Sequence, residues 1–154
     1  LHSRHLILLR GLPGSGKSTW TLEFVKEYKG TAKRVNKDEL RAMLDAGRHT
    51  KGNENFVLRV RDFIVVEALK LGKTVVVDDT NFEPRHVERL RNLAILFEKE
   101  TGKLVVIKEI LIDTPLAVCI ERDAQRPQPI GEKIIRGMYN RWLRPISKAE
   151  ESLS

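Results

Sequence analysis

The sequence contains a single cysteine, no long apolar run and no metal-binding pattern. Its single cysteine, Cys119, cannot close an internal disulfide, and no apolar run approaches the roughly 18 residues that span a membrane. We therefore expect a cytoplasmic protein with no membrane partner. The sequence begins at Leu1 without a secretory leader, which is compatible with a longer parent protein. Zinc binding and Ser-His-Asp hydrolysis are not expected, because no metal-ligand spacing links His2, His5, His49 and His86.

The composition fits one globular domain over residues 1–154. The chain is 41% hydrophobic and 32% charged, enough apolar residues for one ordinary core. Its formal net charge of +7 favours an anionic partner, although a basic surface can also serve solubility alone. The last residues, 147–154, are polar, and we expect them to fray.

Short aliphatic runs alternate with longer helical patterns, which predicts an α/β fold with a four-stranded parallel sheet. Three of the helical patterns end just before a glycine, the usual left-handed stop. Within the second helical pattern, apolar residues at helical spacing predict a core-facing stripe of Phe56, Val60, Phe63, Ile64 and Leu71. The strands are expected at 5–10, 33–36, 74–78 and 104–112, and the helices at 17–28, 53–71 and 84–101.

A glycine-rich segment between the first strand and the first helix matches G-x-x-x-x-G-K-[ST] over residues 11–18. Glycines let the backbone curl so that several N–H groups face a polyphosphate, and the helix start adds its positive dipole. Lys17 would neutralise the β- and γ-phosphates, and the Ser18 hydroxyl would hold Mg²⁺. The predicted nucleotide-binding residues here are Gly14, Ser15, Gly16, Lys17, Ser18 and Thr19.

Two acidic segments follow the second and third strands. Residues 36–39 are similar to the guanine-reading N-K-x-D motif, but Glu39 stands at its fourth position and the segment comes too early for a GTPase. A carboxylate such as Asp38, just beyond the second strand, would instead face the crevice where parallel sheets bind ligands.

These segments together resemble the kinase domain of bacteriophage-type 5′-polynucleotide kinases. The resemblance rests on residues 11–20, 36–41, 79–81, 122–126 and 138–139, and it runs in order along almost the whole chain. It implies that Asp38 contacts the attacking 5′-hydroxyl and that Arg41 binds the phosphate on the 3′ side of the acceptor nucleotide. It also implies ATP as donor and Mg²⁺ as cofactor, and analogy to nucleotide kinases gives the strand order 2-3-1-4.

Simple chemistry agrees with these two roles. A sugar hydroxyl is a weak nucleophile, so a carboxylate within hydrogen-bond reach can orient it and accept its proton. Arg41, three residues further along the same helix, offers a planar fork that matches phosphate oxygens. The alternative is that Asp38 caps the helix and that Arg41 is a solvated surface charge.

Asp79, at the end of the third strand, is predicted to hold Mg²⁺ directly or through water. Asp78 is the competing candidate, because strand periodicity sends the two side chains to opposite faces. Either carboxylate could instead cap the turn that leads into the helix at Pro84. Thr80 and Asn81 complete the D-T-N match and are predicted, with Asp79, to bind substrate.

Two arginines four residues apart mark a predicted helical lid over about residues 115–130. In the resembling family the lid carries an arginine that reaches the phosphates, a role assigned here to Arg126. Arg122 would stack on adenine or pair with phosphate; alternatively both arginines are solvated helix charges. The segment departs from the family pattern in two ways. The spacing from Arg126 to Ile130 is one residue shorter, and Gly131 stands where proline is usual. Two further basic groups could follow a strand's backbone or merely face solvent: Arg85, His86, Arg89 and Arg91, and Arg136, Arg141 and Arg144.

The predicted activity is transfer of the ATP γ-phosphate to the 5′-hydroxyl end of DNA or RNA. The acceptor would be single-stranded or have an exposed end, and a phosphatase or ligase module could be fused to the chain or associate with it. Two rivals stay open: a kinase for a small-molecule hydroxyl, such as a nucleoside, sugar, antibiotic or aminoacyl group, and a nucleic-acid-binding module that holds ATP without transferring phosphate. The predicted catalytic residues are Lys17, Asp38, Arg41 and Arg126.

Overall fold

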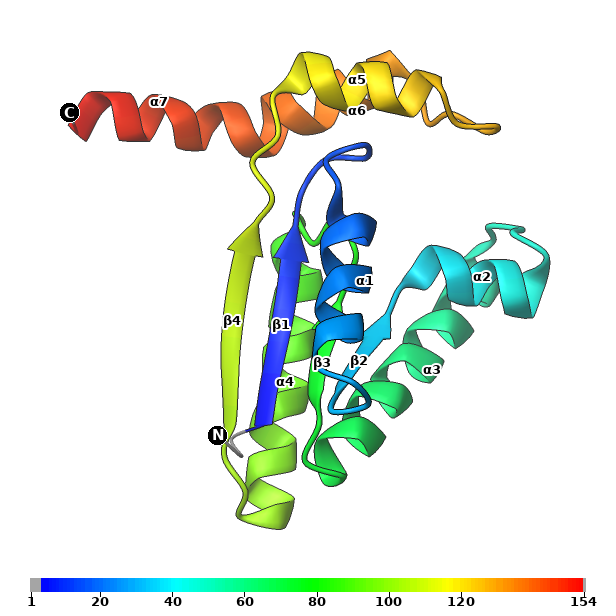
Figure 1. The fold of residues 1–154 in the computed structure, drawn as a ribbon, viewed down its shortest axis with the longest axis vertical. Coiled ribbons are helices and arrows are strands. Elements are labelled where there is room, and N and C mark those ends of the chain that lie inside the picture. The colour runs from blue at the N-terminus through cyan, green and yellow to red at the C-terminus, as the bar shows by residue number, and fades with distance from the viewer. Residues whose placement is uncertain (1–3, 154) are drawn as a thin grey trace.

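A parallel four-stranded sheet forms the centre of the protein in a computed structural model that describes residues 4–153. Its strands lie in the order β2-β3-β1-β4, and every neighbouring pair is parallel (Figure 1). The predicted sheet and its strand order are confirmed. The strands are β1 (Arg4–Arg10), β2 (Ala32–Val35), β3 (Thr74–Val77) and β4 (Val105–Leu111).

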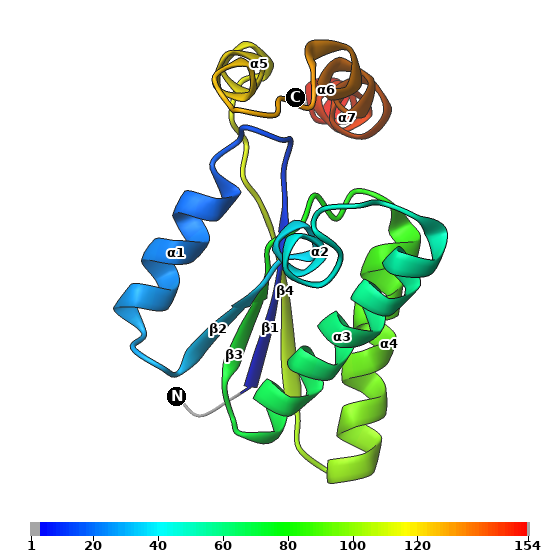
Figure 2. The same cartoon turned by 90° about the vertical axis from the view of Figure 1, so that its right-hand side faces the viewer.

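Helices cover both faces of this sheet. Figure 2 shows α1 on one side and α3 and α4 side by side on the other, while α5, α6 and α7 lie beyond the carboxyl ends of the strands. No helix in residues 4–153 is both long and apolar enough to cross a membrane. The helices are α1 (Lys17–Glu27), α2 (Lys37–Asp45), α3 (Lys51–Lys70), α4 (Pro84–Thr101), α5 (Leu116–Ala124), α6 (Glu132–Met138), the π-helical turn η1 (Tyr139–Leu143) and α7 (Arg144–Leu153).

The two central strands are buried on both faces, which explains their continuous apolar runs. On one face Val75 and Val77 of β3 pack with α3 and α4. On the other face Val76 packs with Ile7 and Leu9 of β1 beneath the aromatic residues of α1. The sheet is therefore fixed on both sides, and its carboxyl edge has a defined position for the segments that follow each strand.

The buried stripe of α3 differs from the predicted one. Phe63 and Leu71 are 65% and 74% exposed, and Phe56 is also exposed, so these three predictions are wrong. Only Val60 and Ile64 pack against the core, and both are partly buried. The prediction failed because apolar residues lie on two faces of this helix. The face that is buried also contains Arg61, and a search for apolar residues alone does not select it. The fully or largely buried residues are Val57, Arg61, Val65, Ala68 and Leu69.

The C-terminal segment also differs from expectation. Residues 147–153, which were expected to fray, belong to helix α7 in the structure, and Ser154 lies outside the described residues. Pro145 lies directly after the π-helical turn η1, where the regular i to i−4 hydrogen-bond pattern is already interrupted, so its missing N–H is tolerated within a continuous helical segment. A polar composition suggests disorder, but it is equally compatible with an exposed helix.

Leu69 and Leu71 provide a matched test of the α3 register. Leu69 is 0% exposed, so we expect Leu69→Ala to lower the free energy of unfolding by about 2–5 kcal/mol. Leu71→Ala removes the same atoms from an exposed site and should change it by less than about 0.5 kcal/mol. Urea denaturation of both variants measures the difference. Equal destabilisation by the two substitutions would contradict the observed register.

Candidate active site

The glycine-rich segment forms a turn between β1 and α1, the predicted strand–turn–helix context. Gly14 and Gly16 both adopt positive φ, at 81° and 99°. A Cβ on Gly14 would lie 2.4 Å from the carbonyl oxygen of Cys119 in α5, so this position requires glycine for space as well as for conformation. The turn is thus packed directly against the lid.

Lys17 begins α1 and folds back over the turn. Its Nζ donates hydrogen bonds to the carbonyl oxygens of Gly11 and Leu12, at 2.8 and 2.9 Å. Burial lowers the pKa of Lys17 to about 8, and the positive charge of Arg126 acts in the same direction. The ammonium group therefore lies in a poorly hydrated site, where a polyphosphate would interact with it strongly.

Asn36, not Asp38, caps helix α2. The Asn36 side chain accepts a hydrogen bond from the backbone N–H of Glu39 at 2.9 Å, and it also donates to the carbonyl oxygen of Asp78 at the end of β3. The alternative interpretation of Asp38 as the helix cap is therefore wrong. The Asp38 side chain is 81% exposed and is available to a ligand.

Arg41 is held between two carboxylates. Its Nη1 donates to Asp38 Oδ1 at 2.7 Å, while its Nε and Nη2 donate to the two carboxylate oxygens of Glu54 at 2.6 and 2.5 Å. The guanidinium is only 13% exposed, so Arg41 is not a solvated surface charge. The hydrogen bonds to Glu54 raise the pKa of Arg41, and Arg41 in turn lowers the pKa of Glu54.

Glu54 was missed by sequence reasoning. It lies in the first turn of α3, thirteen residues after its partner, and no periodicity connects the two segments. The predicted start of this helix at residue 53 was also two residues late, because the cap is Thr50, whose side chain accepts from the Asn53 N–H. A capping threonine followed by an acidic residue in the first helical turn was the available signal.

Asp78 and Asp79 turn to different partners, as strand periodicity predicted. Asp78 pairs with Arg34 of β2 at 2.7 Å. Asp79 accepts the Lys37 backbone N–H at 2.9 Å, and its other oxygen lies 4.0 Å from Arg61. Burial raises the pKa of both carboxyl groups. Through these contacts the end of β3 fixes the first turn of α2.

Ser18, Asp78 and Asp79 line the same cleft and offer oxygen ligands suited to Mg²⁺. Each aspartate retains one buried oxygen without a hydrogen-bond partner, Asp78 Oδ1 and Asp79 Oδ2, which could accept from metal-bound water. Within the described part of the chain, no three His, Cys, Asp or Glu side chains cluster as a complete metal site. This donor set fits a Mg²⁺ ion that is held mainly by water and phosphate oxygens.

Thr80 and Asn81 follow Asp79 but differ in placement. Thr80 lines the cleft, whereas Asn81 is buried at a positive φ of 50°. The Asn81 amide donates to the carbonyl oxygens of Leu9, at 2.7 Å, and Val77, at 3.3 Å. Asn81 therefore ties the ends of β1 and β3 together, and these contacts give it a structural role rather than the predicted contact with substrate.

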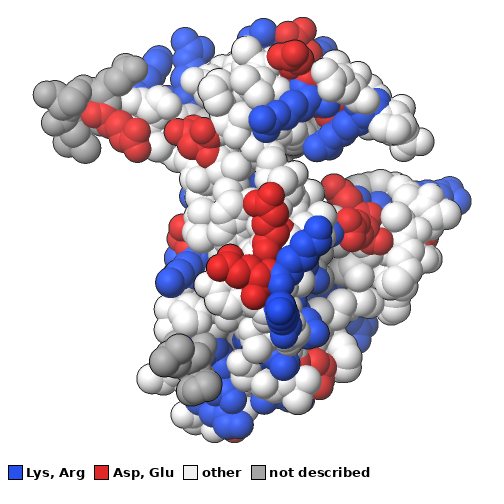
Figure 3. All heavy atoms as spheres, in the orientation of Figure 1, with Lys and Arg blue, Asp and Glu red and all other residues white. Residues whose placement is uncertain are grey.

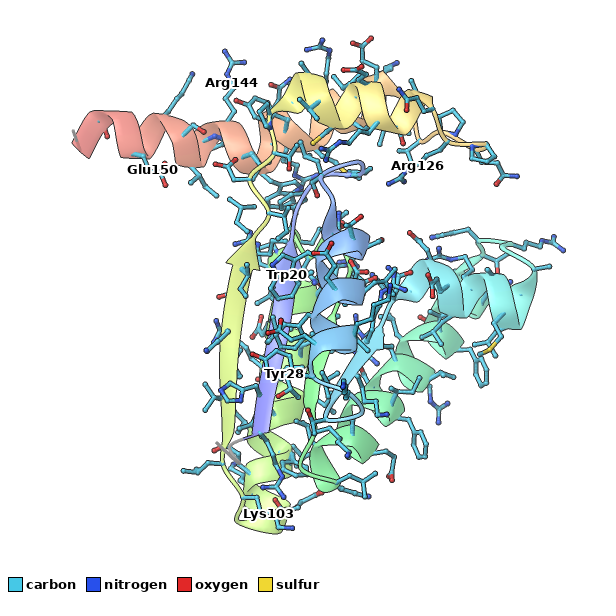
Figure 4. All side chains as sticks on the ribbon, viewed as in Figure 1. Trp20, Tyr28, Lys103, Arg126, Arg144 and Glu150 are labelled. Carbon is cyan, nitrogen blue, oxygen red and sulfur yellow. The ribbon has the colours of Figure 1, made fainter. Side chains whose placement is uncertain are left out.

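The lid follows β4 and is anchored to the glycine-rich turn. Thr114 donates to the Ser15 carbonyl oxygen at 2.6 Å, and Arg122 Nη1 donates to the Gly14 carbonyl oxygen at 3.4 Å. Helix α5 ends at Ala124, so Arg126 lies beyond the helix. The prediction that Arg122 and Arg126 project from one helix face is therefore wrong. Figure 4 shows Arg126 on the side of the lid that faces α2.

Asp123 shapes the loop that carries Arg126. This buried carboxylate accepts the backbone N–H groups of Ile130 and Gly131, at 3.1 and 2.9 Å. Gly131 adopts a φ of 105°, which proline cannot reach, so this turn of the loop requires glycine in its observed conformation. Sequence reasoning missed Asp123, because an isolated acid near the end of a helix most often faces solvent.

One cleft of about 880 Å³ joins these parts. In Figure 3 it opens as the hollow between the lid and α2. The glycine-rich turn, the start of α2 and the end of β3 form its polar floor and sides, and Met138 and Trp142 add an apolar wall beneath the C-terminal helices. The predicted residues that it brings together are Lys17, Ser18, Asp38, Arg41, Asp79, Thr80 and Arg126.

Comparison with known proteins gives a family. Residues 6–143 match the family described as "AAA domain". The chain belongs to this family. An L-seryl-tRNA(Sec) kinase from Methanococcus maripaludis is 30% identical over 148 residues, which cover 93% of this chain and 54% of the relative. A putative bifunctional polynucleotide kinase/RNA ligase from Autographa californica nuclear polyhedrosis virus is 26% identical over 160 residues, which cover 92% of this chain and 21% of the relative.

The fold also matches that of a chain in a solved complex. A chain in a structure of the Pnkp1/Rnl/Hen1 complex aligns with a TM-score of 0.67 and 25% identity, over 83% of this chain and 41% of that one. The chain thus combines a P-loop kinase-like α/β fold with membership of the AAA domain family, and it spans about half, or less, of the length of the matched proteins. Of these two relatives, the viral one is named as a putative polynucleotide kinase/RNA ligase.

The lowered pKa of Lys17 predicts that nucleotide binding takes up a proton at alkaline pH. A bound triphosphate raises this pKa above about 8, because a nearby anion favours the ammonium form. Affinity should therefore fall as pH rises above about 8. Calorimetry at pH 9 in two buffers with different ionisation enthalpies measures the uptake. Lys17→Met should take up no proton, and absence of uptake in the unmodified protein would contradict the assignment.

Proposed function

We propose that this protein is an ATP-dependent polynucleotide kinase that phosphorylates the 5′-hydroxyl end of DNA or RNA. The observation that carries the proposal is the Asp38–Arg41 pair, which lines the same cleft as Lys17 and Ser18. A carboxylate beside an oriented guanidinium suits an acceptor whose hydroxyl lies next to a phosphate.

The donor site is the glycine-rich turn. The backbone N–H groups of residues 14–19 would bind the ATP phosphates at the start of α1, with Lys17 against the β- and γ-phosphates. Mg²⁺ held by Ser18 and Asp79, with Asp78 as the alternative carboxylate, would neutralise charge on those phosphates. Arg126, on the facing side of the lid, would stabilise negative charge on the transferring group. Arg122 supports the Gly14 backbone from the other side of the turn.

The acceptor site is the start of α2. Asp38 would orient the 5′-hydroxyl and accept its proton while the oxygen bonds to the γ-phosphorus and the bond to the β,γ-bridging oxygen breaks, which releases ADP. Arg41 would bind the neighbouring phosphate. Asp38 and Glu54 use three of the five guanidinium N–H groups, which leaves one on Nη1 and one on Nη2 for that phosphate.

Relatives support a nucleic-acid acceptor. The viral relative is named as a putative bifunctional polynucleotide kinase/RNA ligase, and the structural match is a chain of the Pnkp1/Rnl/Hen1 complex. Residues 1–154 would then act as a single kinase domain, with a ligase or phosphatase fused to it or associated with it.

A second candidate function has its own observation. The 30%-identical relative is named as a kinase for L-seryl-tRNA(Sec), whose acceptor is the hydroxyl of an aminoacyl group. Asp38 could orient that hydroxyl equally well, but Arg41 would need a phosphate close to it. An acceptor panel with γ-labelled ATP separates the candidates: a 5′-hydroxyl oligonucleotide, a nucleoside, a sugar and a seryl-tRNA, each with magnesium and with EDTA.

Substitution of Asp38 tests transfer against mere ATP binding. Asp38→Asn keeps the size of the side chain but removes the base, so labelling of a 5′-hydroxyl oligonucleotide should fall by about 10²–10⁴-fold. ATP affinity should stay within about twofold. An unmodified protein that binds ATP but labels no acceptor would indicate the non-catalytic rival, and full activity in Asp38→Asn would remove Asp38 from the mechanism.

Glu54 is expected to position Arg41 rather than to touch substrate. Glu54→Gln replaces one acceptor oxygen with an amide that repels the guanidinium, so the KM for the oligonucleotide should rise on the order of tenfold while the KM for ATP is unchanged. Glu67→Gln, which affects an exposed ion pair with Lys70 on the same helix, is the matched control. Equal effects of both variants would show that the Arg41–Glu54 pair is not specific to the acceptor.

A further inference from the structure

A groove between α3 and α4 extends the proposed acceptor site. It has a volume of about 430 Å³ and is lined by Leu58, Arg85, His86, Glu88, Arg89 and Asn92. Leu58, Arg85 and His86 also line the main cleft. The surface is therefore continuous from Asp38 past α3 to the first turns of α4, and Figure 2 shows these two helices side by side.

The two arginines of this groove are held in a way that leaves their phosphate-binding groups available. Arg85 Nε donates to Glu83 at 2.6 Å, and Arg89 Nε donates to Asp62 of α3 at 2.8 Å. Among the residues that the structure describes, neither arginine uses its Nη groups in a hydrogen bond. Each guanidinium is thus oriented by one carboxylate, and it presents two N–H₂ groups in the planar arrangement that suits phosphate oxygens.

The spacing of these arginines suits an extended anion rather than a single one. Arg85 and Arg89 are four residues apart, so they lie one above the other on the same face of α4. Asp62, which accepts the hydrogen bond from Arg89, also accepts hydrogen bonds from the buried Arg61. The Asp62 carboxylate is therefore held in place by a buried residue of α3, and it orients Arg89 in turn. A row of two oriented cations on a rigid helix matches successive phosphates of a nucleic-acid strand.

The floor of the groove adds surfaces that a nucleoside could use. Leu58 offers an apolar surface, the Asn92 amide can donate and accept, and burial lowers the pKa of His86, which keeps its ring neutral at pH 7. Bases stack on aromatic rings such as that of His86 with little sequence preference. Glu88 is the one acidic residue in the lining, and the carboxylates of Glu83 and Asp62 lie against the Nε sides of the two arginines, so the positive charge of this groove is concentrated at their Nη groups.

We propose that this groove binds the downstream phosphates of a single-stranded polynucleotide whose 5′ end lies at Asp38. The inference rests on the proposed function and adds to it a second binding region, beyond the phosphate at Arg41. The site then favours a polynucleotide over a small acceptor through interactions made several nucleotides away from the reacting hydroxyl.

The test compares a long with a minimal acceptor in the Arg85→Ala/Arg89→Ala variant. A 5′-hydroxyl dodecanucleotide reaches the groove, whereas a nucleoside 3′-monophosphate ends at Arg41. The double variant should raise the KM for the dodecanucleotide about tenfold and leave the KM for the monophosphate within about twofold. The slope of log affinity against log salt for the dodecanucleotide should become shallower by roughly 0.7 for each phosphate that is no longer neutralised, or about 1.4 for both arginines.

Arg91→Ala is the matched control, because Arg91 lies on the same helix but pairs with Glu109 of β4, away from the groove. It should leave both KM values unchanged. Equal changes for the two acceptors, or no change for either, would overturn the proposal. Fluorescence anisotropy with a labelled dodecanucleotide measures binding independently of turnover. If the unmodified protein labels neither acceptor, the proposed function fails, and undiminished binding by the double variant would then exclude the groove as well.

Discussion

The site depends on the parallel pairing of β1, β2 and β3, which places the carboxyl ends of three strands at one edge of the sheet. The glycine-rich turn follows β1, the start of α2 follows β2, and Asp78 and Asp79 follow β3. Hydrogen bonds then link these segments: Asp79 accepts the Lys37 N–H, and Asn36 donates to the carbonyl oxygen of Asp78. Because the two central strands, β1 and β3, are buried on both faces, Asp38 and Lys17 face one cleft on a rigid base.

A second set of contacts makes the lid part of the same unit. Close packing of Gly14 against Cys119 and the bonds from Thr114 and Arg122 attach α5 to the turn that would hold the phosphates. Movement of the lid would therefore be transmitted to the donor site. The loop with Arg126 has fewer constraints: Asp123 holds its far end, while the Arg126 side chain is half-exposed and only 3.9 Å from that carboxylate. Such an arrangement lets one arginine adjust to a nucleotide while its loop keeps its shape.

Local patterns predicted much of this architecture, and long-range partners set the limit. The strands and the placement of Lys17 and Asp38 followed from aliphatic runs, the glycine-rich motif and the rule that loops at the carboxyl edge face the ligand, whereas the strand order came from analogy to nucleotide kinases. Glu54 and Asp123 could not be predicted, because their partners are fixed only when α3 packs beside α2 and when the lid loop closes. The predicted core stripe of α3 was wrong because an arginine is normally placed on an exposed helix face. Arg61 is fully buried here, beside the carboxylates of Asp62 and Asp79.

The central claim is that Asp38 and Arg41 bind the hydroxyl and the phosphate of one polynucleotide end in line with ATP. A crystal structure with Mg²⁺, a non-hydrolysable ATP analogue and a short 5′-hydroxyl oligonucleotide tests it most directly. The account predicts the terminal oxygen within about 3 Å of the Asp38 carboxylate, opposite the γ-phosphate, with the next phosphate on Arg41. An oligonucleotide end bound away from Asp38, or a γ-phosphate that Asp38 cannot reach through the acceptor, would contradict it.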